Sequence, residues 1–566
     1  MRIATDRTKA EQIDLIIEGA EALSDYRVFM EKILEWKYPG FMQEAINYRK
    51  RFKKTLWLAP RGHGKTTGGT TSYATHKILG DPDIRVLLVS NTFSQAEDMG
   101  DEIRQNLERP SVTARYGTQM PPSSPQTDPK TKYRWSNGKL SVRDRNRVGK
   151  ESTLTCMGAF GPVISKHNDV ILLDDIVDEE TAESPKLRKK LAKWLKKTLL
   201  PCLEPDGELH IVGTRWHPLD IYQTVMDELD DFKVIIHKAL NEDDDGNLSA
   251  LWPERMSVKD LLGIKRRRGS IIFNMSYQND VELAKGKFFR EGWFQFIKSE
   301  DVPSGGTLVQ AYDLALGEKP DSDYFATCTC QTSVLEGEPR FYIFGAFRKR
   351  SMTFNEQAEY VRKNAGDADK VVIEDVQYQK ALKQEASRMG LPAKGYNPKG
   401  KSKTIRGYSL TSFFENKQVF FVDSINTRAM RDEMLEFPDG QHDDYFDVCD
   451  MSIKESAQFI GGVRLLDMEE LTEKEDTREQ YVAKQLDGSD EADEVRDDLI
   501  DRGVVYPTCQ KRGKVLEDEM AEGKNPCEAC PGRKACREGS SPVREVAVKE
   551  ESDVRGRIME DEGAWR

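Results

Sequence analysis

The 566-residue sequence lacks any apolar run approaching the roughly 20 residues that a membrane-spanning helix needs. It also lacks a secretory leader, since residues 1–7 are mostly polar. We therefore expect a cytoplasmic protein without a membrane anchor. The chain does not have the excess of positive charge that is common in nucleic-acid-binding proteins, because its formal net charge is −12.

Most of this negative charge lies in one segment. Residues 463–502 contain fifteen acidic residues against six basic ones, so the rest of the chain is close to neutral. Such a segment is typical of a solvated connector rather than of an enzyme site. Basic stretches elsewhere, at residues 143–150, 186–197 and 265–268, could contact phosphate groups or could be solvated helix faces.

A glycine-bearing loop at residues 59–66 has the sequence of a phosphate-binding loop, Ala-Pro-Arg-Gly-His-Gly-Lys-Thr. It follows the apolar run 56–58 and precedes a predicted helix at residues 73–79. This is the order of strand, loop and helix that such a loop requires. A chance glycine-rich turn is the alternative, which the next motif disfavours.

The side chains of this loop suit ATP with Mg²⁺. Lys65 would reach the β- and γ-phosphates, and the Thr66 hydroxyl would complete the Mg²⁺ shell at a helix N-terminus. Ala59 departs from the usual pattern, because a glycine normally stands there. The other expected nucleotide contacts are Arg61, Gly62, Gly64 and Thr67.

A second buried-type strand, residues 170–173, ends in two acids. Asp174 could hold Mg²⁺ through water, and Asp175 could orient the attacking water, with Glu179 or Glu180 as alternatives for that base. Without the phosphate loop, these acids could simply end a strand and cap the next helix. The loop upstream favours the catalytic interpretation.

A third strand, residues 209–213, leads to Thr214 and Arg215. A polar residue and an arginine at a strand tip can sense the γ-phosphate and transmit its loss to a moving element. We therefore expect both residues at the nucleotide.

Acids also end strands in the second half of the chain. Strand 308–312 is followed by Asp313, and strand 370–373 is followed by Glu374, within an alternation that predicts a mixed sheet flanked by helices. A third cluster, Asp443-Asp444, opens a predicted helix, with Asp447 on a shared face with Asp443. Carboxylates from three such elements could hold two divalent ions for phosphodiester hydrolysis. Helix capping is the alternative for the third cluster alone.

The order of these motifs resembles the large terminase subunit of tailed bacteriophages. The main matches are Gly-Thr-Arg-Trp-His-Pro-x-Asp at residues 213–220 and Phe-Pro-x-Gly-x-His-Asp-Asp at residues 437–444. Further matches are Tyr38-Pro39, Arg61 and the Phe-x-x-x-Tyr-Gln-Asn segment at residues 273–279. The resemblance covers most of residues 30–460.

The resemblance implies an α/β protein with a P-loop NTPase three-layer domain at residues 1–280. A linker at 281–305 and a ribonuclease H-like endonuclease domain at 306–462 would follow. It also implies ATP-driven translocation of viral double-stranded DNA into a procapsid, with cutting of concatemeric DNA. Expected partners are the portal protein, the small terminase subunit and further copies in a homo-oligomeric ring on the portal, in the host cytoplasm.

By the same resemblance, the nuclease ligands for Mg²⁺ or Mn²⁺ are Asp313, Glu374 and one of Asp443 or Asp444. The basic residues 401–406 resemble the stretch that lies near the nuclease cleft in this family, where they would contact the DNA backbone. A basic loop without a role is the alternative.

Four late cysteines lie outside the usual pattern of this family: Cys509, Cys527, Cys530 and Cys536. We expect a small module at residues 503–540, between the acidic connector and a charged tail at 541–566. Four thiolates could bind Zn²⁺ and fold such a module, and an iron–sulfur cluster or unliganded cysteines are the alternatives.

Two other functions fit parts of the sequence. An ATP-dependent helicase–nuclease of repair or restriction would share the ATPase core, although no clear strand-separating motifs follow Asp175. A non-catalytic assembly protein would have lost its active sites, but Lys65, Asp174, Asp313 and Glu374 are all present.

Overall fold

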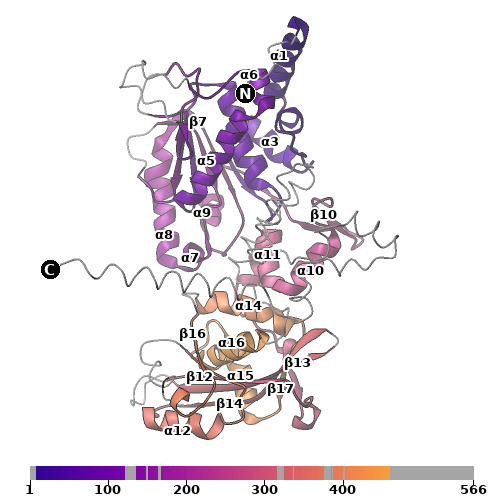
Figure 1. Ribbon diagram of the computed structural model, residues 1–566, viewed down its shortest axis with the longest axis vertical. Helices are drawn as coiled ribbons and strands as arrows, with labels where there is room; N and C mark the ends of the chain where they lie inside the picture. Colours follow the sequence, from indigo (N-terminus) through magenta and orange to yellow (C-terminus); the bar gives the residue numbers. More distant parts are fainter. Residues whose placement is uncertain are drawn as a thin grey trace, which may run out of the picture. The chain divides into compact units, whose positions relative to one another are not determined.

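The computed structural model describes residues 8–121, 135–147, 151–162, 167–314, 324–335, 337–374, 384, 386–398 and 402–458 (Figure 1). The acidic connector, the cysteine module and the tail expected after residue 462 lie outside the described residues, with Cys509, Cys527, Cys530 and Cys536. The described residues build two large sheets with helices around them. None of their helices is both long and apolar enough to cross a membrane.

The first sheet has eight strands. In spatial order they are β3 (Trp135–Ser136), β4 (Lys139–Leu140), β5 (Leu154–Gly158), β2 (Val86–Ser90), β6 (Asn168–Asp174), β7 (Leu203–Gly213), β1 (Lys54–Leu58) and β8 (Lys233–Ile236). In this spatial order, neighbouring strands from β5 through β2, β6, β7 and β1 to β8 pair in parallel. At the other edge, β3 pairs with β4 and β4 with β5, both antiparallel. A separate hairpin consists of β9 (Leu240–Glu242) and β10 (Leu248–Ala250).

Both faces of this sheet are covered by helices. Side chains alternate across a strand, so Val86 and Leu88 of β2 pack in one core cluster while Leu87 and Val89 pack in another. The helical segments of this half are α1 (Lys9–Ser24), α2 (Tyr26–Val28), η1 (Phe29–Ile33), α3 (Met42–Arg51), η2 (Thr67–Thr71), α4 (Ser72–Gly80), α5 (Phe93–Glu108), α6 (Pro110–Tyr116), α7 (Glu179–Glu183), α8 (Pro185–Trp194), η3 (Leu195–Leu199), η4 (Leu200–Cys202), α9 (Ile221–Glu228), α10 (Val258–Arg268), α11 (Ser270–Gln278) and η5 (Glu282–Ala284). The apolar runs predict buried strands, and the structure assembles them into a mostly parallel sheet with helices on both faces.

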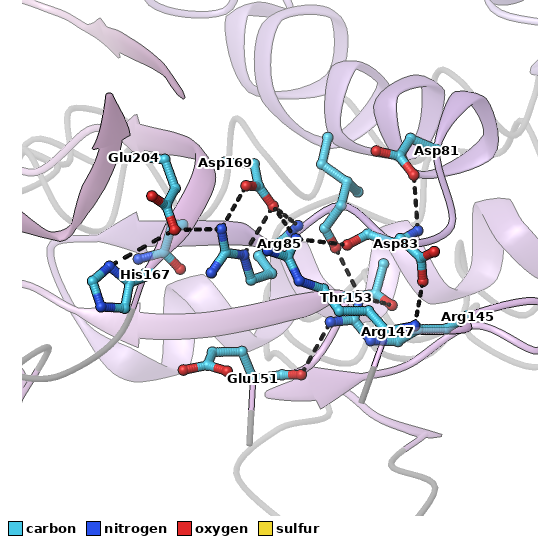
Figure 2. A network of polar contacts seen from close by, with 12 residues as sticks. Asp81, Asp83, Arg85, Arg145, Arg147, Glu151, Thr153, His167, Asp169 and Glu204 are labelled. Carbon is cyan, nitrogen blue, oxygen red and sulfur yellow. Dashed lines mark hydrogen bonds and ion pairs between the residues drawn. The ribbon is translucent and has the colours of Figure 1, made fainter. Parts of the chain in front are cut away.

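A polar network ties together the amino-terminal ends of β2, β6 and β7 (Figure 2). The Arg85 guanidinium lies 2.6 Å from Asp169 and 2.7 Å from Glu204, and its side chain is only 7% exposed. Arg147 adds a second cation, 3.2 Å from Asp169. The phosphate loop follows the carboxyl end of β1, and the network lies at the amino-terminal ends of the parallel strands. The network therefore stabilises the fold and is remote from the loop.

The second sheet is mixed, as predicted. Its spatial order is β11 (Gln295–Ile297), β17 (Val419–Val422), β14 (Glu338–Lys349), β13 (Phe325–Leu335), β12 (Thr307–Asp313), β15 (Lys370–Glu374) and β16 (Ala393–Tyr396). The strands β12, β13 and β14 form an antiparallel meander, and the other pairings are parallel. The segment expected to be a linker, residues 281–305, contains β11 and so contributes a strand to this sheet.

Helices lie on both sides of the second sheet. They and the short turns are η6 (Glu291–Trp293), η7 (Ser299–Asp301), α12 (Phe354–Asn364), α14 (Lys403–Glu415), α15 (Ile425–Glu436) and α16 (Asp444–Ala457). On one side, Val361 of α12 packs in a cluster with Tyr312 and Ile373. On the other side, α16 lies against β13, where the Ser452 hydroxyl donates to Cys328 Sγ at 3.3 Å.

Candidate functional site

The loop between β1 and η2 has the backbone that the phosphate-loop motif requires. Gly62 and Gly64 have φ angles of 72° and 67°, in the left-handed region that favours glycine. A Cβ atom on Gly64 would also stand 2.9 Å from the Trp36 ring. Both glycines are therefore needed for this loop conformation.

Lys65 of this loop points to the acids at the end of β6. Its Nζ lies 2.8 Å from Asp175 Oδ2, and its side chain is only 10% exposed. Burial lowers the pKa of Lys65, but Asp175 and Asp174 more than compensate, so the pKa is raised and the ammonium stays charged. Asp175 has a φ of 40°, which turns the chain sharply away after the strand.

Asp174 receives two hydroxyl groups from the helix that follows the loop. Thr66 Oγ1 donates to Asp174 Oδ1 at 2.9 Å, and Thr70 Oγ1 donates to Asp174 Oδ2. Burial and the nearby Asp175 raise the pKa of Asp174, whose residue is 2% exposed. The structure thus brings together Lys65, Thr66, Asp174 and Asp175, as the sequence predicts, and adds Thr70.

Thr70 lies outside the phosphate-loop motif. The sequence feature that could have indicated it is its spacing from Thr66, because residues four apart lie on the same side of a helical segment. Thr67, which opens η2, is half-buried. Glu179 and Glu180, the alternative bases, stand in the first turn of α7.

The strand order places the tip of β7 between the phosphate loop and Asp174, because β7 pairs with both β1 and β6. Thr214 Oγ1 donates to the Ala59 carbonyl at 3.2 Å, so this residue touches the start of the loop. Arg215 is held differently. Its Nε lies 3.0 Å from Asp220 in a buried ion pair, and its backbone N–H donates to Asn279 Oδ1. Its expected contact with nucleotide stays a prediction.

Arg61 is half-buried in the loop, and its Nη1 atom is buried. Its guanidinium lies over the Trp216 ring, 5.3 Å from the centroid, and its backbone N–H donates to the Ser276 carbonyl at 3.0 Å. The loop therefore contacts two segments that the sequence singled out, at residues 213–220 and 273–279.

The second group of acids gathers on one side of the second sheet. Because Tyr312 pairs with Ile373 in the parallel strands β12 and β15, Asp313 and Glu374 follow at the same level. Side chains two residues apart in a strand lie on the same face, so Asp313 lies on the face of Ala311. Ala311 pairs with Cys328, whose side chain contacts α16, so this is the face that α16 covers. The three elements thus converge as predicted.

The neighbouring acids interact electrostatically with Asp313. Burial raises the pKa of Asp313 well above its usual value, and Asp447 and Glu374 raise it further. Lys403 opposes this shift, and Asp444 adds to it. Asp313, Glu374, Asp444 and Asp447 therefore share one electrostatic environment with a single opposing lysine among its main contributors.

Two cations from α14 hold one face of α16. Lys403 Nζ lies 2.7 Å from Asp443 Oδ1 and 2.6 Å from Asp447 Oδ2. Arg406 pairs with Asp447 and, at 3.1 Å, with Asp450. For the basic stretch 401–406 the sequence offers a DNA contact or a basic loop without a role, and the pairing of Lys403 and Arg406 with these acids is a finding of the structure.

Asp444 lies toward a different set of groups. Burial and Asp443 raise the pKa of Asp444, while Arg348 and His442 lower it. The Arg348 guanidinium also lies 4.8 Å from the centre of the Tyr324 ring. Asp443 is therefore paired with Lys403, whereas Arg348, whose ion pair is with Glu433, is only a nearby charge for Asp444.

The donor set suits a hard divalent ion, since carboxylate oxygens are its usual protein ligands. Burial first, and the neighbouring acids Asp447 and Glu374 second, raise the pKa of Asp313, and a bound cation would favour its ionised form. As placed, however, no three His, Cys, Asp or Glu side chains among the described residues form a ready metal site. The five cysteines in the described part of the chain are buried and form no disulfide there: Cys156, Cys202, Cys328, Cys330 and Cys449.

Comparisons with known proteins find similarity in fold only. No family model matches the chain, and no curated protein is similar in sequence. The fold is similar to that of the large terminase from thermophilic bacteriophage D6E in complex with ADP, at 11% identity and a TM-score of 0.45, over 75% of this chain and 100% of that one. The HK97 bacteriophage large terminase aligns over 77% of this chain and 99% of its own, at 12% identity and a TM-score of 0.32. The large terminase nuclease from thermophilic phage G20c with bound zinc aligns over 28% and 93%, at 17% identity and a TM-score of 0.22.

Proposed function

We propose that the chain is a large terminase subunit that couples ATP hydrolysis to DNA movement and also cuts DNA. One observation carries this proposal: two separate sheets of one chain each gather acids at their strand ends. In the first sheet, these acids contact the lysine and threonine of a phosphate loop. In the second, acids from two strands and a helix converge beside two cations.

The first site supports hydrolysis of ATP. Lys65 is a charged, buried ammonium in the phosphate loop and would bind the phosphates. Thr66 and Asp174 would hold Mg²⁺, which neutralises charge on the transferred phosphoryl group. Asp175 is the candidate base, because its Oδ1 is buried without a hydrogen-bond partner in the described structure and could orient a water molecule.

Thr214 contacts the loop from the neighbouring strand and is the better candidate for a residue that responds to the γ-phosphate. Arg215 supports the adjoining turn through its ion pair with Asp220. We infer that loss of the γ-phosphate would be transmitted along this turn.

The second site supports cleavage of a phosphodiester. Asp313 and Glu374 would hold Mg²⁺ or Mn²⁺ together with Asp443 or Asp444. Such ions activate water and stabilise the leaving oxygen. The ion pairs of Asp443 and Asp447 with Lys403 favour Asp444 as the ligand from α16 when DNA is absent.

In this function the substrate is double-stranded viral DNA, moved through a portal into a procapsid and cut from a concatemer. The small terminase subunit and further copies of this chain in a ring would complete the motor in the host cytoplasm. Phosphate contacts would dominate DNA binding, so the affinity should fall as salt rises and depend little on sequence.

Displacement of a triplex-forming strand from duplex DNA tests this function. The wild-type protein on its portal should displace the third strand when ATP is present, and Lys65→Ala should not. Lys139→Ala, which removes an exposed lysine from β4, is the matched control. Unwinding of a forked duplex instead would favour the helicase–nuclease alternative.

A further inference from the structure

Lys403 stands where a helix start disfavours a cation. It is the first residue of α14, directly after the N-cap Ser402, and no acidic residue lies in that first turn. The partial positive charge of a helix N-terminus repels an ammonium group. The ion pairs of Lys403 with Asp443 and Asp447 compensate for this repulsion.

The acids that face α14 form a stripe on α16. Asp443, Asp447 and Asp450 are spaced by four and three residues and so lie on one side of the helix. Lys403 holds the first two, and Arg406 holds the last two. Asp447 is therefore shared between the two cations.

The two cations differ in exposure. The Arg406 side chain is 5% exposed and its partner Asp450 is fully buried, so this pair is a fixed part of the fold. The Lys403 and Asp443 side chains are 43% and 44% exposed. An exposed ion pair is weak because water competes for both groups, so the contact of Lys403 with Asp443 can break at little cost. The second partner, Asp447, is only 13% exposed, but it keeps Arg406 as a partner when Lys403 leaves.

Lys403 also reaches the acids at the sheet end. It is a direct electrostatic neighbour of Asp313, where it offsets the repulsion from Asp447 and Glu374. A cation held in this position reduces the attraction of the whole cluster for a second cation. A backbone phosphate of DNA is a singly charged anion and could form an ion pair with the Lys403 ammonium group in place of these acids.

We propose that Lys403 is a tethered cation that neutralises Asp443 and Asp447 when DNA is absent and moves to a backbone phosphate when duplex DNA binds. Its departure frees Asp443 and removes one of the two cations that hold Asp447, which stays paired with Arg406, so the affinity of the cluster for a divalent ion rises with DNA. Lys403 is thus a positioning residue that couples binding of the divalent ion to binding of DNA. The inference rests on the proposed nuclease function.

Direct measurement of Mn²⁺ binding tests this inference without relying on cleavage. Free Mn²⁺ is followed by electron paramagnetic resonance, with and without a short phosphorothioate duplex that resists cutting. Lys403→Met should bind Mn²⁺ roughly tenfold more tightly than wild type without DNA, because a like charge is removed. The duplex should raise the affinity of the wild type and leave that of Lys403→Met unchanged.

Two variants control for charge and folding. Lys454→Met removes a lysine that pairs with Asp450 on the same helix at 2.6 Å, and it should behave as the wild type. Lys403→Arg keeps the cation and should restore weak binding, while circular dichroism verifies that each variant is folded. Equal or weaker Mn²⁺ binding by Lys403→Met, or an equal effect of DNA on both proteins, would overturn the inference.

The proposed function can fail separately. If Asp313→Ala binds Mn²⁺ as the wild type does, the acids are not a metal site and both proposals fall. If Asp313→Ala loses the binding but Lys403→Met does not strengthen it, only the tethered cation is refuted.

Discussion

Replacing Thr70 by valine should weaken ATP hydrolysis while leaving the fold intact. Thr70 is 1% exposed, and its hydroxyl donates to Asp174, which would hold Mg²⁺ at the nucleotide. Valine keeps the branched shape of the side chain but removes this donor. The Asp174 carboxylate then keeps only the hydrogen bond from Thr66 in that pair of hydroxyls.

The expected size of the effect follows from the charge of the acceptor. A hydrogen bond to a charged group contributes about 1.5–3 kcal/mol, and loss of the donor also raises the cost of keeping Asp174 ionised. If this energy is lost in the transition state, turnover should fall by about tenfold to a hundredfold. Nucleotide binding should weaken less, because Lys65 is untouched.

Thr75→Val is the matched control. Thr75 is also fully buried, and its hydroxyl donates to the Thr71 carbonyl at 2.8 Å, away from the acids. Steady-state release of phosphate is measured for both variants, with their thermal unfolding. Turnover by folded Thr70→Val within about twofold of Thr75→Val would refute the role of the Thr70 hydroxyl.

Three further predictions concern stability and the tail. Arg85→Met should lower the free energy of unfolding by about 2–4 kcal/mol in denaturant titrations, because Asp169 loses a nearly buried partner; a change below about 0.5 kcal/mol would contradict this. Burial lowers the pKa of His210 to about 4 from a usual 6.5. As the pH falls below 6.5, the unfolded chain binds a proton at His210 before the folded chain does. The free energy of unfolding should therefore decrease between pH 6.5 and pH 4, by up to about 3 kcal/mol. This acid-induced loss should be smaller in His210→Gln, and equal pH profiles would rule out the buried histidine as its source. Elemental analysis of the purified protein should find about one zinc per chain. The double variant Cys527→Ser with Cys530→Ser should lose this zinc and keep its ATPase activity. Iron together with sulfide would indicate an iron–sulfur cluster, and the absence of both zinc and iron would rule out a metal site.

The sequence predicts site residues best where they stand directly after a predicted strand. Lys65, Thr66 and Asp174 were predicted together because their spacing matches a phosphate loop and a buried strand, and the structure joins them. Asp313 and Glu374 are predicted to share a site because each follows a strand of one mixed sheet, and the structure pairs these strands, β12 and β15, in parallel.

The sequence was less informative where a role depends on which elements pack together. The resemblance predicts that residues 401–406 lie near the nuclease cleft, but the ion pairs of Lys403 with Asp443 and Asp447 depend on how α14 packs against α16. Arg215 was expected at the nucleotide, but its ion pair with Asp220 depends on a turn whose conformation a motif does not specify. The choice between Asp443 and Asp444 likewise needs the positions of Lys403 and Arg348.

The central claim, two separate active sites on one chain, is tested most directly by nicking of supercoiled plasmid with Mn²⁺, measured beside ATP turnover. Lys65→Ala should lose ATP turnover and keep nicking that EDTA stops. Asp313→Ala should lose nicking and keep ATP turnover. Loss of both activities in either folded variant, or normal nicking by Asp313→Ala, would contradict the claim.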